Sequence, residues 1–121
     1  MKAMPHPQEI EVWYVLPAIR RELVLQFKKQ GMKQKEIARI LKVTEPAISQ
    51  YLKEKRAKGI KFEGQIKQSI QRAARKIILQ KSCIVKEIQQ ICKKFRKNGM
   101  LCKIHREKDH NVSKECSVCC N

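Results

Sequence analysis

The chain is 121 residues long and has a formal net charge of +17, from 28 Lys and Arg residues against 11 Asp and Glu. That much self-repulsion adds nothing to folding, so it indicates a polyanionic partner, with nucleic acid first and an anionic membrane surface second. No window approaches about eighteen consecutive apolar residues, and the first residues lack the apolar stretch of a signal peptide. We therefore expect a cytoplasmic protein with no transmembrane helix and no membrane partner.

The N-terminal third predicts a short arm and a first helix. Two early prolines disfavour helix, so residues 1–9 are expected to form an extended arm. Apolar side chains then recur at helical spacing. Pro17 lies inside this pattern and either kinks a helix or begins one near Leu16–Ala18, which we favour. Gly31 is expected to end this helix in a left-handed conformation.

Two short amphipathic helices follow, at Gln34–Leu41 and Glu45–Lys55. Ala38 is the small residue that two crossing helices need where they touch. Ile48 lies ten residues later, a separation that lets it share a core with Ala38. Thr44 is a good N-cap for the second helix. The pattern predicts a helix-turn-helix, whose second helix enters the major groove of DNA.

The second helix separates an apolar face from a polar one. Ala47, Ile48, Tyr51 and Leu52 form its predicted inner face. The predicted base contacts are on its outer face, because Gln and Ser hydrogen-bond well to base edges: Glu45, Ser49, Gln50 and Lys53. The predicted phosphate contacts are Arg20, Arg21, Lys33, Gln34, Lys35, Thr44, Lys55 and Arg56.

Residues 61–97 predict two longer helices rather than one. Ile66 to Ile78 and Ile84 to Phe95 each form an apolar stripe, and the segment between them contains Ser82, which could cap the second helix. These stripes exceed what a helix-turn-helix needs for its core. We expect them to form a homodimer interface, since such proteins usually pair to span two half-sites. The alternative is that both helices fold back on the first helix.

Several stretches resemble a known family, namely Val12–Leu23, Gln34–Ala38, Ala47–Leu52 and Ile91–His105 with a later Cys-x-x-Cys. They resemble the helix-turn-helix of phage-repressor-like regulators and, more narrowly, are similar to a group of archaeal predicted transcriptional regulators. The resemblance implies a DNA-binding transcription factor. This chain departs from it in two places: Lys42 stands where the turn usually has Gly, and Phe95 stands where a cysteine paired with Cys92 is expected.

The tail, residues 98–121, is rich in Cys and His and short of aliphatic residues, so it is expected to have little structure of its own. Cys116-x-x-Cys119 has the spacing with which two thiolates hold one metal ion. Two ligand sets fit. A zinc ion would take Cys102, His105, Cys116 and Cys119. An iron–sulfur cluster would take Cys92, Cys102, Cys116 and Cys119. The third interpretation of these cysteines is a tail with free thiols and no metal. Cys83 lies before the tail and is expected to be packed on a helix.

These observations predict an all-α fold: a helix-turn-helix bundle, then one or two longer helices and a Cys-rich, little-structured tail. The predicted segments are an arm (1–9), a DNA-binding domain (10–60), a helical dimerisation or packing region (61–97) and a metal-binding tail (98–121). The predicted function is a sequence-specific transcriptional regulator that binds double-stranded DNA as a homodimer, with activity set by metal or redox state. The alternative is a nonspecific architectural DNA- or RNA-binding protein with a structural zinc tail. No arrangement of catalytic residues stands out, so we expect neither an enzyme nor a small-molecule substrate.

Overall fold

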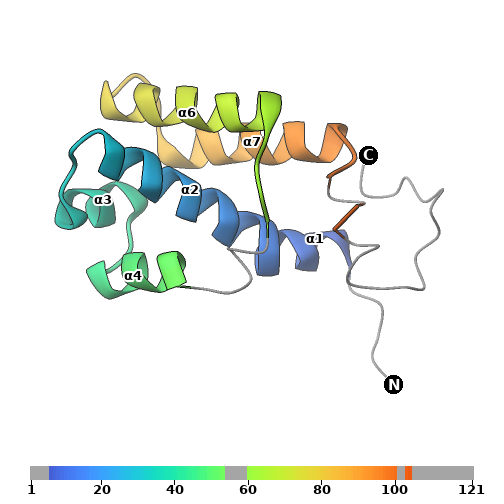
Figure 1. Ribbon diagram of the computed structural model, residues 1–121, viewed down its shortest axis with the longest axis horizontal. Coiled ribbons are helices and arrows are strands. Elements are labelled where there is room, and N and C mark those ends of the chain that lie inside the picture. Colours follow the sequence, from blue (N-terminus) through green and yellow to red (C-terminus); the bar gives the residue numbers. More distant parts are fainter. Residues whose placement is uncertain (1–5, 54–59, 101–102, 105–121) are drawn as a thin grey trace.

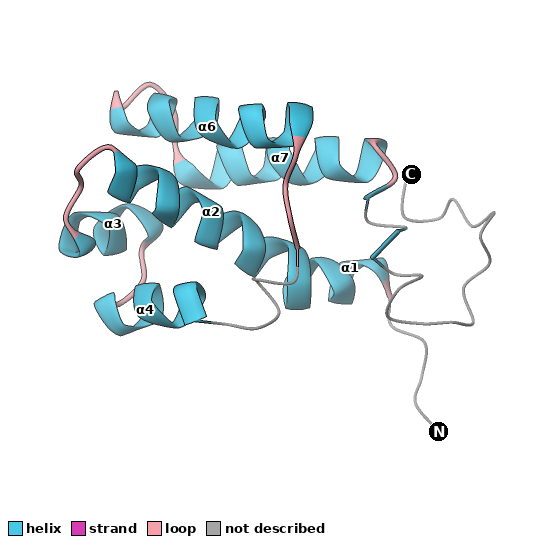
Figure 2. Ribbon diagram, viewed as in Figure 1, coloured by secondary structure: helices cyan, strands magenta, loops and turns pink. Residues whose placement is uncertain are grey.

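The computed structural model describes residues 6–53, 60–100 and 103–104. Within these ranges helices are joined by turns and loops, and no strand occurs (Figure 2). None of the described helices is long and apolar enough to cross a membrane. The all-α class is confirmed, as are the two longer helices after the short pair. The elements are α1 (Pro7–Ile10), η1 (Glu11–Val15), α2 (Leu16–Lys29), α3 (Gln34–Leu41), α4 (Glu45–Lys53), α6 (Gly64–Ile78) and α7 (Ile84–Lys97).

One helical run passes from α1 through η1 into α2. At the second junction the Leu16 N–H donates to the carbonyl of Glu11, five residues back, which is the spacing of a π-helix. Pro17 has no N–H to donate to the carbonyl four residues back, and the wider turn that precedes it accommodates this loss. The structure therefore differs from two expectations. Residues 7–9, expected to be extended, are helical from Pro7 onward, and the run begins well before Leu16–Ala18.

Helix α2 ends as the sequence predicts. Gly31 has a φ of +85°, in the left-handed region. The Met32 N–H donates to the carbonyl of Phe27 at 3.1 Å, and the Gly31 N–H donates to that of Lys28 at 3.0 Å. This pair of bonds is a Schellman motif, which satisfies carbonyls that the end of a helix leaves without partners.

The same motif closes α3, but with a lysine in the left-handed position. Lys42 has a φ of +57°, and the Val43 N–H donates to the carbonyl of Ala38 at 3.0 Å. Lys42, which stands where the turn of this family usually has Gly, thus takes a conformation usually left to glycine. A residue with a Cβ adopts it at a cost of about 1–2 kcal/mol. The sharp reversal that turns α3 into α4 is therefore made against local preference and held by packing.

Helices α6 and α7 fold back on α2, and each of the three contacts the other two. The helices lie beside α2 in Figure 1. Burial of their stripes decides between the two readings of residues 61–97: these side chains form the core of a single chain rather than a free dimer surface. The buried stripe residues are Ile66, Ile70, Ala73, Ala74, Ile77, Ile84, Ile88, Ile91 and Phe95.

Two further contacts hold α7 in place. Phe95, which stands where the family resemblance suggests a cysteine, packs edge to face on Phe62, with ring centroids 6.0 Å apart. Near the C-terminal end of α7, Arg96 Nη1 donates to Glu11 Oε1 at 3.0 Å in a half-buried ion pair. This pair joins residues 85 positions apart and fastens α7 to η1.

The start of α7 differs from the prediction. Ser82 does not cap it; its hydroxyl is buried and has no hydrogen-bond partner among the described residues. Cys83 takes the N-cap position instead, makes no side-chain capping bond and is exposed rather than packed.

The left-handed Lys42 generates a stability prediction. Lys42→Gly relieves the strain but adds unfolded-state entropy, so we expect a gain in unfolding free energy of no more than about 1 kcal/mol. Lys42→Val, whose branched side chain tolerates this conformation poorly, should lower it by about 1 kcal/mol or more. Urea unfolding measures both variants.

The control is Arg39→Gly, at an exposed site inside α3. There glycine should lower the unfolding free energy by about 1 kcal/mol, whereas glycine at position 42 should raise it. Equal losses from glycine at both positions would contradict the strain at Lys42.

Candidate nucleic-acid interface

Helices α3 and α4 share an apolar core with α2. Ala38 and Ile48 are both buried, at 5% and 0% exposure. Helix α4 contacts α2 as well as α3, so it is supported by two helices. The predicted inner face is confirmed, since Ile48 is buried and the other three residues of that face are half-buried: Ala47, Tyr51 and Leu52.

Thr44 caps α4 as predicted. Its Oγ1 accepts a hydrogen bond from the Ala47 N–H at 3.3 Å. Pro46 follows in the first turn, where a missing N–H costs no helical bond. Because the Thr44 hydroxyl only accepts in this cap, its hydrogen remains available to a phosphate oxygen beside the helix start.

Gln34 ties the two helices together in a way that the sequence analysis did not anticipate. From the first residue of α3, its Nε2 donates to the carbonyl of Glu45 and to Ser49 Oγ, both at 3.0 Å. A side-chain amide has two N–H hydrogens, and both are used here. Gln34 was predicted to contact a phosphate, but its side chain has no hydrogen left for one. Residue type alone could not reveal this bond, since its partners lie 11 and 15 positions away.

The outer face of α4 presents the predicted base-reading groups. Glu45, Gln50 and Lys53 are exposed, and Ser49 is half-buried. The Gln34 amide fixes the position of the Ser49 oxygen, and leaves its hydroxyl hydrogen free to donate. The chemistry on this face therefore combines an amide, a hydroxyl, an ammonium and a carboxylate, which together can meet every base edge of the major groove.

The predicted phosphate-contacting cations lie in different environments. Lys33 and Lys35 are exposed at the start of α3. Arg20 is half-buried with its guanidinium carbon 6.0 Å from the centre of the Tyr51 ring, a cation–π contact between α2 and α4. Arg21 is also half-buried, and its Nε has no hydrogen-bond partner among the described residues. Lys55 and Arg56 lie outside the described residues.

Of the predicted metal ligands, the structure describes Cys92 alone; Cys102, His105, Cys116 and Cys119 lie outside the described ranges. Cys92 is buried in the core, and desolvation, helped by the nearby charge of Glu11, raises the pKa of its thiol to about 11. A metal binds the thiolate, so burial and the raised pKa of Cys92 add to the cost of replacing its proton with a metal ion. Residues 6–53, 60–100 and 103–104 contain no cluster of potential metal ligands.

Comparison with known families matches residues 18–59 to the bacterial regulatory proteins of the arsR family. The match covers about a third of the chain and includes α2 from Ala18, then α3 and α4. No curated protein and no solved structure matches the chain. The matched family differs from the phage-repressor-like group that the sequence resembles, but the helix-turn-helix is common to both. Match and geometry together support a DNA-binding transcriptional regulator.

The Gln34 bridge predicts coupled losses of stability and DNA binding. Gln34→Ala removes two hydrogen bonds and should lower the unfolding free energy by about 1–2 kcal/mol. It should also weaken DNA binding under conditions where the variant remains folded, because Ser49 and the start of α4 lose their tether. Urea unfolding and fluorescence anisotropy measure the two effects. Gln68→Ala, at an exposed glutamine of α6, is the matched control and should change neither.

Proposed function

We propose that this protein is a sequence-specific, DNA-binding transcriptional regulator that reads bases with Glu45, Ser49, Gln50 and Lys53. The observation that carries this proposal is the polar outer face of α4, held rigidly by a buried Ile48 below and the Gln34 amide beside it. A base-reading helix must be fixed in this way, because hydrogen bonds to base edges discriminate only when their geometry is set in advance.

Each group on this face suits a particular base edge. The Gln50 amide matches the N6 and N7 atoms of adenine, and the Lys53 ammonium matches the O6 and N7 atoms of guanine. The Glu45 carboxylate can accept a hydrogen bond from the N4 amino group of cytosine, whereas Ser49 can donate to several bases. The protein would be positioned on the duplex by phosphate contacts from Arg20, Arg21, Lys33, Lys35 and Thr44, with Lys55 and Arg56 following α4 in sequence.

Selection from a random duplex library tests this proposal. A preferred site should emerge, and Gln50→Ala should weaken binding to it by about 1–3 kcal/mol while binding to random DNA is unchanged. Lys35→Gln, which removes a phosphate contact, should instead weaken both alike and lower the slope of log affinity against log salt by about 0.9. Equal losses for Gln50→Ala on both duplexes, or no enriched site, would favour a nonspecific architectural protein.

A homodimer is proposed because two reading helices are needed to span two half-sites. The apolar stripes of α6 and α7 are buried in the core of one chain. A dimer interface must therefore use another apolar surface. Val12 and Trp13 are adjacent on η1 and 57% and 41% exposed. We expect the protein to sediment as a dimer and Trp13→Ser as a monomer, with Leu79→Ser, also highly exposed, as the control. A monomeric parent protein at concentrations that saturate DNA would contradict the dimer.

Zinc, held by Cys102, His105, Cys116 and Cys119, is the metal we propose for the tail. The support is the spacing of these residues together with the burial and raised pKa of Cys92, which disfavours the set with an iron–sulfur cluster. Elemental analysis after anaerobic purification should find one zinc per chain, lost in Cys116→Ser and kept in Cys92→Ala. Iron with visible absorbance, or metal lost on changing Cys92, would contradict this assignment.

A further inference from the structure

A second basic surface lies away from the recognition helix. Residues 63–97 contain ten Lys and Arg residues and two glutamates, Glu63 and Glu87. Helix α2 contacts both α4 and α6, and it runs between them in Figure 1. A duplex bound to α4 would therefore be separated from these cations by α2. The DNA whose bases are read by α4 would not neutralise them.

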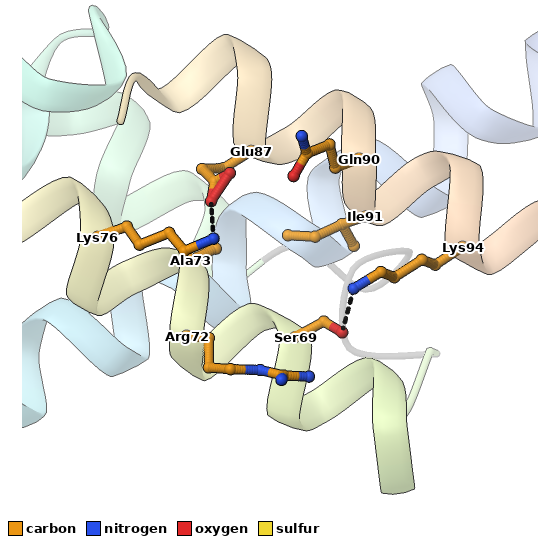
Figure 3. Close-up of a pocket in the computed structure, with 8 residues that line it drawn as sticks. All are labelled: Ser69, Arg72, Ala73, Lys76, Glu87, Gln90, Ile91 and Lys94. Carbon is orange, nitrogen blue, oxygen red and sulfur yellow. Dashed lines mark hydrogen bonds and ion pairs between the residues drawn. The ribbon is translucent and has the colours of Figure 1, made fainter. Parts of the chain in front are cut away.

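The surface is hollowed into a groove between α6 and α7, shown in Figure 3 with α2 passing behind it. Lys94 Nζ donates to Ser69 Oγ at 3.2 Å across the groove. Lys76 Nζ lies 3.8 Å from Oε1 of Glu87, whose side chain is only 4% exposed. The groove is lined by Ser69, Arg72, Ala73, Lys76, Glu87, Gln90, Ile91 and Lys94.

The charges inside the groove do not cancel. Lys76 neutralises Glu87, the one acidic group among the described residues that line it. Arg72 is exposed and makes no ion pair or hydrogen bond within the described part of the chain, and Lys94 is bonded only to a neutral hydroxyl. Two cations from two helices therefore face a concave surface with no counter-charge from residues 6–53, 60–100 or 103–104. An anion bound there would be attracted by both positive charges. It would also accept hydrogen bonds from the N–H groups of Lys94, Arg72 and the Gln90 amide.

The cationic surface is larger than one anion requires. On α7, Lys86, Lys93 and Lys97 recur at spacings of seven and four residues, which places them along one side of the helix next to Gln90. On α6, Arg75 lies one turn from Arg72. All four flanking residues are exposed. A row of cations that continues past a groove on both of its helices fits a chain of phosphates better than a single small anion.

We propose that the α6–α7 groove binds the phosphate backbone of a second nucleic-acid segment, so that each chain can hold two segments at once. The Arg72 guanidinium would make the paired hydrogen bonds to a phosphate that its planar geometry favours, and Lys94 would supply a point charge beside it. The Ser69 hydroxyl, which accepts from Lys94, keeps its own hydrogen to donate to the same phosphate. The groove offers no arrangement for reading bases, so this binding is independent of sequence.

A bridging assay tests the proposal with the full-length protein. Short random-sequence duplexes labelled with either a donor or an acceptor fluorophore are mixed, and energy transfer reports two duplexes held together. The parent protein should give transfer that falls steeply with salt. Arg72→Gln combined with Lys94→Gln should abolish transfer, while single-duplex binding continues. Lys61→Gln combined with Lys67→Gln removes the same charge outside the groove and should keep transfer.

The outcomes separate this inference from the proposed function. If energy transfer persists in the Arg72/Lys94 variant, the proposal that the groove binds a second duplex is wrong, because bridging would then come from paired recognition helices. Absence of transfer in the parent protein also overturns it. If pyrophosphate instead raises the melting temperature of the parent protein, but not of the variant, the groove takes a small phosphate and not a nucleic acid. The Gln50→Ala variant tests sequence preference in a separate experiment. The Arg72/Lys94 variant should keep the preference for the selected site whether or not it still bridges two duplexes.

Discussion

Burial of α2 from several sides is the constraint on which the rest of the molecule depends. Ile19, Leu23, Val24 and Phe27 of this helix are all fully buried. Helices α3 and α4 supply part of their cover, and α6 and α7 supply another part. The helix-turn-helix is too short to bury α2 alone, and α6 and α7 have stripes that need a partner. Each pair of helices therefore completes the core that the other leaves open.

The charge distribution follows from this arrangement. Because the apolar faces of four helices meet α2, their polar faces point outward and carry the lysines and arginines. Acidic side chains are few, and two of them are used at helix contacts: Glu11 with Arg96, and Glu87 with Lys76. Exposed cations are thus left with little internal compensation on both pairs of helices. Their mutual repulsion would fall when a polyanion binds.

The recognition helix shows how local strain and tertiary support are combined. Lys42 takes a conformation that its Cβ disfavours, and in return α3 reverses directly into α4. Thr44 then satisfies a backbone N–H at the start of α4, and Gln34 fixes both the first carbonyl of that helix and the Ser49 hydroxyl. The polar face is held from below by apolar contacts and from the side by an amide. Neither contact uses the exposed groups of Gln50 and Lys53, which stay free for a ligand.

By itself the sequence determined the local units: the helix pair around Ala38 and Ile48, the cap at Thr44 and the end of α2 at Gly31. These follow from helical periodicity and from backbone preferences that act over a few residues. Only the tertiary structure decided what covers each apolar stripe, because periodicity identifies a face but not its partner. The same limit explains why the stripes of α6 and α7 predict a dimer interface, and why the burial of Cys92 in the core is not evident from its spacing to the other cysteines. The Gln34–Ser49 bond and the Arg72–Lys94 groove likewise join residues that are far apart in sequence, and chain folding alone brings such groups together.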